Sequence, residues 1–167
     1  LFFTPKYVKA KEMADQGAFG KVHLVKQSEK HSGPHSPWFW DVDRSGGGVW
    51  MDMGCHGIAF CYWFLGRPGI KSVYCQMGTY VHGNKTRGED EVIGILEFSN
   101  GAMGIVEDSW TRRGGMDDRI EIYGDAGLTY ANLHMGNALP TYSDAGYGYA
   151  VEKASTTTGW SYPVFEE

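Results

Sequence analysis

The sequence predicts an α+β domain built on a mostly antiparallel sheet, and three observations support this fold class. Two apolar stretches with helical spacing come first, at residues 5–17 and 49–65. From residue 70 onward, apolar and polar residues alternate with the period of two that is typical of strands. The pair Asn100-Gly101 joins two of these stretches and is a strong hairpin signal. Helices followed by consecutive hairpins are the pattern of an α+β domain.

The predicted elements can be placed in order along the chain. The first helix, residues 5–17, begins at a proline, which suits a first helical turn, and ends at a glycine. A strand is expected over 21–27 and an aromatic-rich loop over 31–43. Three consecutive glycines then precede the second helix, 49–65. The later strands are expected at 70–81, 91–99, 102–110, 119–123 and 128–133, with a loop beyond Gly136.

Size and charge exclude several classes of partner. The chain has 167 residues, which suits one domain. Its 15 Lys and Arg residues against 20 Asp and Glu give a net charge of −5, so the chain as a whole does not attract nucleic acid or anionic membranes. The longest uninterrupted apolar run, residues 58–65, is far shorter than the roughly 20 residues that span a bilayer. We therefore expect neither a nucleic-acid nor a membrane partner.

The cysteines indicate a reducing compartment. Cys55, Cys61 and Cys75 are odd in number and form no Cys-x-x-Cys pair. This spacing argues against a disulfide framework and against a zinc site made of thiolates. We therefore predict a cytoplasmic protein. Because the chain begins with Leu1 rather than Met, we expect its true N-terminus to lie upstream, and the sequence is silent on a signal peptide.

The most informative stretch is residues 45–58, in which Asp52 and His56 follow the run of glycines. On a helix, their spacing of four residues places both side chains on one face. The glycines let another segment or a ligand approach the helix start closely. Histidine can move a proton near neutral pH, while a nearby carboxylate can orient it or bind a substrate hydroxyl. Structural roles also fit, with Asp52 favouring the helix dipole and His56 a satisfied core histidine.

A metal site is a second hypothesis for this region. Side chains that precede the glycines could join Asp52 and His56 as ligands of one metal ion. These side chains are His31, His35 and Asp41 or Asp43. We favour a substrate-specificity loop instead, because Gly33 and Pro34 preclude a regular helix that would present both histidines together.

The chain resembles the second, substrate-side domain of the Gfo/Idh/MocA family of NAD(P)-dependent oxidoreductases. Four segments carry the resemblance in the family's usual order, and two later segments are also similar. The four are QGAFGKV at 16–22, SGGGVWMDMGCH at 45–56, LGRP at 65–68 and LEFSNGA at 96–102; the later two are IEIYGDAG at 120–127 and GWSYP at 159–163.

The resemblance implies a glyceraldehyde-3-phosphate-dehydrogenase-like C-terminal domain, which is a large open sheet with helices on one face. Residues 1–167 would form the substrate-binding and oligomerisation domain, and the N-terminal Rossmann domain would lie outside this chain. The full-length enzyme would transfer hydride at a CH–OH group of a sugar, an inositol or a related polyol. NAD or NADP would be bound mainly by the missing domain, whose cofactor-binding residues are unknown here.

The resemblance also implies roles for individual residues. Asp52 would bind substrate hydroxyl groups, and His56 would act with it as the acid/base that takes the alcohol proton. No metal ligand is assigned. Further substrate contacts are expected just after the first predicted strand and in the aromatic loop, although an ordinary solvated strand end and a buried tryptophan are the alternatives. These residues are Glu29, Lys30, His31 and Trp38.

The chain lacks two family motifs, a Gly-x-Gly-x-x-Gly phosphate loop and Glu-Lys-Pro, and its glycine run at 46–48 does not fit the first. We therefore expect the chain to be a fragment that is inactive alone. Family members commonly associate through the open sheet face, so we expect a homo-oligomer, with Tyr74, Tyr80 and Trp110 as aromatic residues to be covered. A metal-dependent hydrolase or isomerase and a non-catalytic assembly domain remain as alternatives.

Overall fold

The computed structural model describes residues 1–134, 139–146 and 160–161. The strands are β1 (Val22–Lys30), β2 (Ile70–Gly78), β3 (Glu91–Phe98), β4 (Met103–Ser109), β5 (Asp117–Gly124), β6 (Gly127–Asn132), β7 (Thr141–Ser143) and β8 (Trp160–Ser161). They form one sheet in the order β2-β3-β4-β1-β5-β6-β7-β8. Neighbouring strands are antiparallel except β1 and β4, which are parallel.

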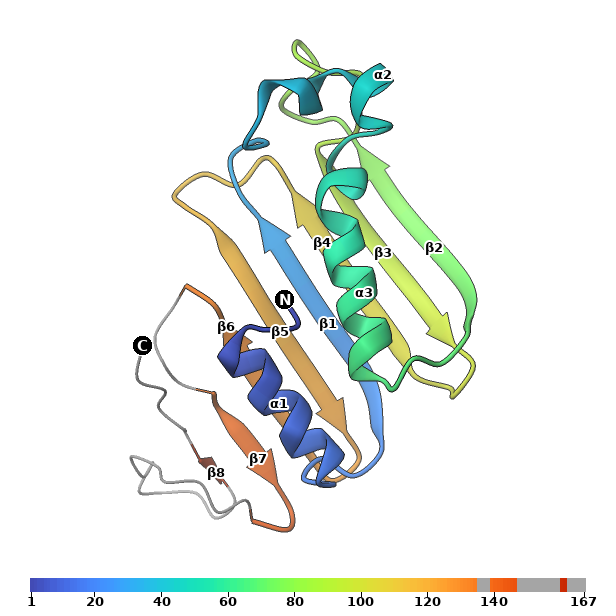
Figure 1. Ribbon diagram of the computed structural model, residues 1–167, viewed down its shortest axis with the longest axis vertical. Helices are drawn as coiled ribbons and strands as arrows, with labels where there is room; N and C mark the ends of the chain where they lie inside the picture. Colours follow the sequence, from blue (N-terminus) through green and yellow to red (C-terminus); the bar gives the residue numbers. More distant parts are fainter. Residues whose placement is uncertain (135–138, 147–159, 162–167) are drawn as a thin grey trace.

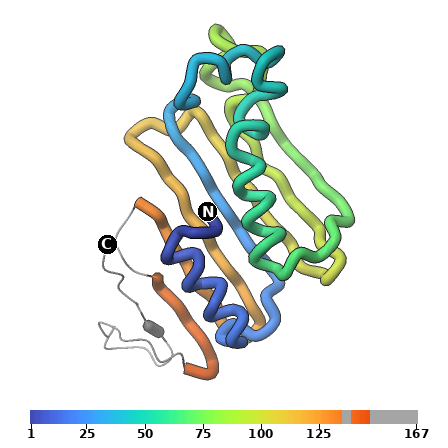
Figure 2. The backbone as a smooth tube through the Cα atoms, in the orientation of Figure 1, coloured from blue at the N-terminus to red at the C-terminus, as the bar shows by residue number. Residues whose placement is uncertain are grey.

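The helical segments are α1 (Pro5–Asp15), α2 (Val42–Ser45) and α3 (Cys55–Phe64), with a 3₁₀ turn η1 (Pro37–Trp40) and a π-helical turn η2 (Trp50–Gly54). Helices α1 and α3 lie on the same face of the sheet (Figure 1). The predicted α+β fold with an open, mostly antiparallel sheet is therefore confirmed. The tube in Figure 2 shows the segment with η1 and α2 gathered at one end of the sheet, beyond the start of α3.

Helix α1 (Pro5–Asp15) begins at the predicted proline and ends two residues before the predicted glycine. Gly17 has a φ of 82°, a left-handed conformation that is common just after a helix. Tyr7, Ala10 and Met13 stand three residues apart and are fully buried. This spacing forms the single apolar stripe that packs on the sheet.

Helix α3 packs closely on the centre of the sheet because Gly57 faces β1 and β4. A Cβ atom at Gly57 would stand 2.5 Å from Oε1 of Gln27 and from Cγ1 of Val106, closer than packed atoms allow. Phe60 and Phe64 continue the buried face of the helix. The approach of helix to sheet therefore requires a residue without a side chain at this position.

Several boundaries differ from the predictions. Strand β1 runs three residues further than expected, because β4 and β5 pair with its end on both sides. The predicted loop at 31–43 contains η1 and the start of α2, and the predicted helix at 49–65 divides into η2 and α3. The ring of Trp50 fills the space left by Gly54 in η2 and by Gly94 in β3. A π-helical turn of this kind inserts locally into an α-helix and is frequent at functional sites.

Strand β2 ends at Gly78 rather than at residue 81. The carboxylate of Asp90 accepts the backbone N–H groups of residues 80–82 at 2.7–2.8 Å, which diverts them from the strand ladder. Burial opposes ionisation of Asp90, but these three hydrogen bonds outweigh it and hold its pKa below the ordinary value.

The loop expected beyond Gly136 is interrupted by strands. β7 pairs with the edge of β6, and β8 pairs with β7. The hydroxyl groups of Thr129 and Thr141 are 2.8 Å apart across the first of these pairs. Tertiary pairing thus overrides a composition that is typical of loops. Residues 135–138, 147–159 and 162–167 lie outside the described residues, and with them the rest of this predicted loop and part of the GWSYP segment.

The face of the sheet away from the helices is open and partly apolar. Tyr74, Ile93, Ile95 and Met103 are between 40% and 62% exposed there. Two of the aromatic residues expected on this face do not lie on it. Trp110 is fully buried, and Tyr80 lies in the turn after β2. None of the described helices is long and apolar enough to cross a membrane.

Candidate functional site

The glycine run at residues 46–48 lets the loop that contains Glu89 pack against the start of η2. A Cβ atom at Gly48 would stand 2.0 Å from the carbonyl oxygen of Glu89, and this oxygen accepts the N–H of Val49 at 2.9 Å. The Glu89 carboxylate accepts the N–H groups of Gly48 and Trp50 at 3.3 and 3.0 Å. The protein itself therefore satisfies the N–H groups that a phosphate would need, and the glycine run serves close packing.

Asp52 lies in η2, where Trp110 fixes its carboxylate. The Nε1–H group of Trp110 donates to Oδ2 of Asp52 over 3.0 Å. The indole is fully buried, and the backbone N–H of Trp110 donates to the carbonyl oxygen of Asp90 at 2.9 Å. A buried, anchored donor thus holds one carboxylate oxygen of Asp52, while Oδ1 has no hydrogen-bond partner in the described part of the chain.

His56 lies in the first turn of α3 and is anchored by Glu29 of β1. Its Nδ1 is 2.8 Å from Oε2 of Glu29. The Glu29 side chain is only 8% exposed, whereas that of His56 is 49% exposed. The hydrogen bond to Glu29 raises the pKa of His56; partial burial opposes this rise, and the charges of Glu29 and Asp52 add to it. With Nδ1 bound to Glu29, Nε2 is the ring nitrogen that has no hydrogen-bond partner among the described residues.

The predicted Asp52–His56 pair is therefore two separately anchored groups on neighbouring helical segments. Within the described residues, no hydrogen bond joins the two side chains. The sequence spacing gave no sign that Glu29 and Trp110 would be their partners, because these residues lie 27 and 58 positions away along the chain. The period of two along β1 does place Glu29 on the same face as Gln27, but only the packing of α3 decides which helical residue it meets.

Glu29 lies between two other carboxyl groups on the helical face. In the strand register, it is opposite Asp108 of β4 and Asp118 of β5. Asp118 accepts hydrogen bonds from the Tyr7 hydroxyl at 2.7 Å and from Gln27 at 3.4 Å. Asp108 is fully buried, and among the described residues neither of its carboxyl oxygens has a hydrogen-bond partner.

Asp108 is a neutral acid at neutral pH. Burial, followed by the negative charge of Glu29, raises its pKa from 3.8 to about 8. Two adjacent carboxyl groups in a poorly solvated place cannot both ionise at low cost. Asp108 is therefore the carboxyl group whose raised pKa favours the protonated form.

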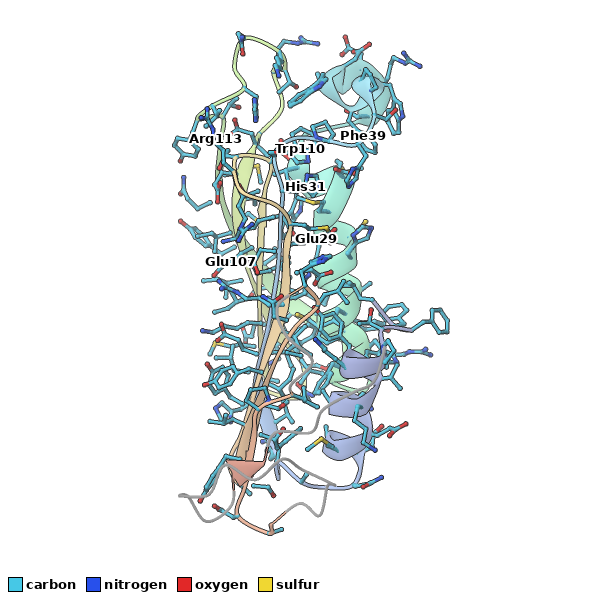
Figure 3. All side chains as sticks on the ribbon, turned by 90° about the vertical axis from the view of Figure 1, so that its left-hand side faces the viewer. Glu29, His31, Phe39, Glu107, Trp110 and Arg113 are labelled. Atoms are coloured by element: carbon cyan, nitrogen blue, oxygen red, sulfur yellow. The ribbon has the colours of Figure 1, made fainter. Side chains whose placement is uncertain are left out.

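The structure separates the residues predicted to contact substrate. Glu29 lies on the helical face, and His31, the residue just after β1, lies on the same face because it continues the alternation of the strand (Figure 3). Lys30 points to the open face, where its Nζ donates to Glu107 at 2.8 Å. Figure 3 shows Glu29 and His31 on the side of α3 and Glu107 on the opposite side of the sheet. The structure therefore does not bring Lys30 to the site.

The aromatic loop forms a layer beside the site. His31 is 6% exposed, and its ring centroid lies 4.7 Å from that of His35. Trp38 is 39% exposed and stacks on Phe39 at 3.8 Å between ring centroids. Trp40 packs on the buried Trp110 at 5.3 Å. Trp38, the predicted substrate contact, is thus more exposed than Trp40 and Trp110.

The side chains proposed as metal ligands have other partners. Asp43 pairs with Arg87 at 3.0 Å, and Asp52 and His56 bind Trp110 and Glu29. His31 and His35 do lie together, at 4.7 Å between ring centroids, although no regular helix presents them. In the described part of the chain, no group of three or more His, Cys, Asp or Glu residues is arranged to hold a metal ion. The thiol of Cys55, beside His56, is also not activated, because burial and then the charge of Asp52 raise its pKa.

These features define the class of protein: an α+β domain that presents a carboxylate-anchored histidine on the helical face of an open sheet. Residues 7–129 match the family model of the GFO/IDH/MocA C-terminal domain. The chain therefore belongs to the Gfo/Idh/MocA family, as its motifs indicated.

Curated relatives and solved structures agree with this assignment. The chain is 26% identical over 132 residues to myo-inositol 2-dehydrogenase of Thermotoga maritima, covering 78% of this chain and 38% of the relative. It is 26% identical over 161 residues to levoglucosan dehydrogenase of Pseudarthrobacter phenanthrenivorans, covering 81% of this chain and 41% of the relative. The chain thus spans about two fifths of the length of these relatives.

Among solved structures, the chain is 34% identical to GenD2 from gentamicin A biosynthesis in complex with NAD. The TM-score is 0.77, and the match covers 99% of this chain and 46% of that one. A levoglucosan dehydrogenase in complex with NADH and levoglucosan shares the fold, with a TM-score of 0.78, 21% identity and coverage of 97% of this chain and 44% of that one.

Proposed function

We propose that this chain is the substrate-side domain of a nicotinamide-dependent oxidoreductase that acts on a sugar, an inositol or a related polyol. Membership of the Gfo/Idh/MocA family supports the reaction class. The names of the relatives, myo-inositol 2-dehydrogenase and levoglucosan dehydrogenase, support the substrate class. The observation that carries the proposal is the half-exposed His56, whose Nδ1 is hydrogen-bonded to a buried carboxylate and whose Nε2 has no hydrogen-bond partner among the described residues.

The chemistry of the site fits removal of a proton from an alcohol. Nε2 of His56 accepts the hydroxyl proton, and the raised pKa of His56 favours the imidazolium that results. Asp52 accepts a hydrogen bond from a substrate hydroxyl through Oδ1, while Trp110 holds Oδ2 in place. His31, whose buried Nδ1 has no partner among the described residues, and the exposed Trp38 supply further contacts.

NAD or NADP would supply the hydride acceptor, and the complex of GenD2 with NAD favours NAD. Residues of η2 and of the start of α3 fit the edge of such a cofactor, because Met51 is 55% exposed and Cys55 is exposed beside His56. They do not fit its phosphate groups, since Glu89 satisfies the N–H groups of Gly48 and Trp50. We therefore propose that a Rossmann domain outside residues 1–167 binds most of the cofactor.

Two further properties belong to the proposal. The open sheet face, with Tyr74, Ile95 and Met103 exposed, is a self-association surface, and light scattering of Ile95→Glu should show a smaller assembly than wild type. A wild-type protein that is monomeric at high concentration would contradict this assignment. The three cysteines are all free thiols, which supports the cytoplasm as the compartment.

The test of the function uses the full-length gene product that contains this chain. Purified enzyme should reduce NAD or NADP in the presence of inositols or sugars, as followed by nicotinamide absorbance. Asp52→Asn and His56→Ala should each lower kcat by roughly 10²–10⁴-fold, the usual contribution of a general acid or base. Asp15→Asn, at the exposed end of α1, is the matched control and should retain full activity. Full turnover in both site variants would refute the proposal.

A further inference from the structure

On the helical face, Glu29 forms a hydrogen bond with His56. The two residues come from different layers of the fold, the sheet and the helices that cover it. Glu29 lies in β1, which is paired along its length on both sides, while His56 lies in α3 above the sheet. A residue of a central strand has little freedom to move. The 2.8 Å contact between Oε2 and Nδ1 therefore fixes the imidazole ring relative to the sheet.

Because Glu29 is buried, it can position His56 without binding the substrate itself. Its side chain is 8% exposed, and its Oε2 is in hydrogen-bond contact with Nδ1 of His56. A substrate that reaches Nε2 would bind the other nitrogen of the ring from the one that Glu29 holds. The carboxylate thus acts on the histidine rather than on a substrate hydroxyl.

Several charged or titratable groups face this histidine. They are Glu29 on β1, Asp108 on β4, Asp52 on η2 and Cys55 on α3. Asp108 is neutral because burial and the charge of Glu29 keep it protonated. Trp110 already holds the Asp52 carboxylate. Glu29 is therefore the carboxyl group that is in hydrogen-bond contact with the imidazole.

We infer that Glu29 is a positioning residue for the proposed oxidoreductase reaction: it holds neutral His56 with the proton on Nδ1, so that Nε2 is the nitrogen that accepts the substrate proton. This inference rests on the proposed function for its meaning in catalysis. The geometry also assigns a direction to the proton transfer. The hydroxyl proton moves to Nε2, and the second proton stays on Nδ1 between the imidazolium and Glu29.

Histidine tautomers can be read directly by nuclear magnetic resonance of the 167-residue chain labelled with ¹⁵N-histidine. The sequence contains six histidines, and a His56→Gln variant assigns the signal of interest. In the wild type, neutral His56 should carry its proton on Nδ1. In Glu29→Gln, the amide oxygen can still accept this hydrogen bond, so the tautomer should persist while the pKa of His56 falls.

Glu29→Ala removes both the charge and the acceptor. We expect the Nδ1–H preference to be lost and the pKa of His56 to fall as well. Glu107→Gln removes a carboxylate from the open face of the same sheet and should leave both properties unchanged. A His56 tautomer and pKa that are identical in wild type and Glu29→Ala would overturn the inference.

Kinetics of the full-length enzyme link this inference to catalysis. Glu29→Ala should lower kcat by at least tenfold with a smaller change in KM, and Glu29→Gln should shift the acidic limb of the kcat–pH profile to lower pH. If kcat and its pH profile do not change although the tautomer does, the positioning role in catalysis is wrong. If His56→Ala retains full activity while the tautomer still depends on Glu29, the proposed function fails and the anchoring of His56 stands.

Discussion

Replacing Asp108 by asparagine tests whether the raised pKa of this buried carboxyl group makes the stability of the protein depend on pH. Asp108 is fully buried, and its pKa is raised from 3.8 to about 8 by burial and by Glu29. Between pH 3.8 and about pH 8, the folded chain therefore binds one more proton than the unfolded chain. In this window, stability is greatest at low pH and falls as pH rises, by about 1.4 kcal/mol for each pH unit from this group alone.

The size of the predicted change in the free energy of unfolding follows from the width of this pH range. Between pH 4 and pH 7, the contribution of Asp108 to the free energy of unfolding falls by about 4 kcal/mol. Asparagine has nearly the same shape and does not titrate, so Asp108→Asn should lose this dependence. The stability of the variant minus that of wild type should therefore grow with pH, whatever constant offset the buried amide introduces.

Urea unfolding followed by tryptophan fluorescence at several pH values from about 5 to about 8 measures this difference. Other titrating groups are shared by the two proteins and cancel. Asp43→Asn is the matched control, because Asp43 is 81% exposed and pairs with Arg87 on the surface; its effect should stay within about 0.5 kcal/mol at every pH. Parallel stability curves for wild type and Asp108→Asn would refute the reasoning.

Three further substitutions test the packing around the site by urea unfolding. Tyr7→Phe removes the 2.7 Å hydrogen bond to Asp118 and should cost about 1–3 kcal/mol, more than a surface Tyr→Phe change. Asp90→Ala leaves three backbone N–H groups without their acceptor and should cost at least about 2 kcal/mol; a neutral effect would contradict its capping role. Gly48→Ala places a Cβ atom 2.0 Å from the carbonyl oxygen of Glu89, and full wild-type stability would show that this contact is not tight.

Local patterns in the sequence determined most of the elements. The proline and glycine at the ends of α1, the alternation in β3 and the Asn100-Gly101 turn act through neighbouring residues, so they can be read without a structure. Where prediction failed, distant residues decided the outcome. Asp90 ends β2 at Gly78 by binding N–H groups across a turn, and β6 draws a Thr- and Ser-containing segment into β7.

The candidate site shows the same division. Asp52 and His56 could be selected from their residue types, their spacing and the family motif, because these are properties of one short segment. Their anchors could not be found in that way. Glu29 reaches His56 from β1, Trp110 reaches Asp52 from the position just after β4, and Lys30 is turned to the opposite face by the alternation of β1.

The sequence by itself thus determined the fold class, the family and the two side chains that could carry the chemistry. Only the tertiary structure decided which nitrogen of His56 is bound to a carboxylate, which carboxyl group of the helical face is neutral and which predicted contacts share that face. The physical reason is that protonation and orientation depend on burial and on charges a few ångströms away, and folding brings these together from residues far apart in the chain.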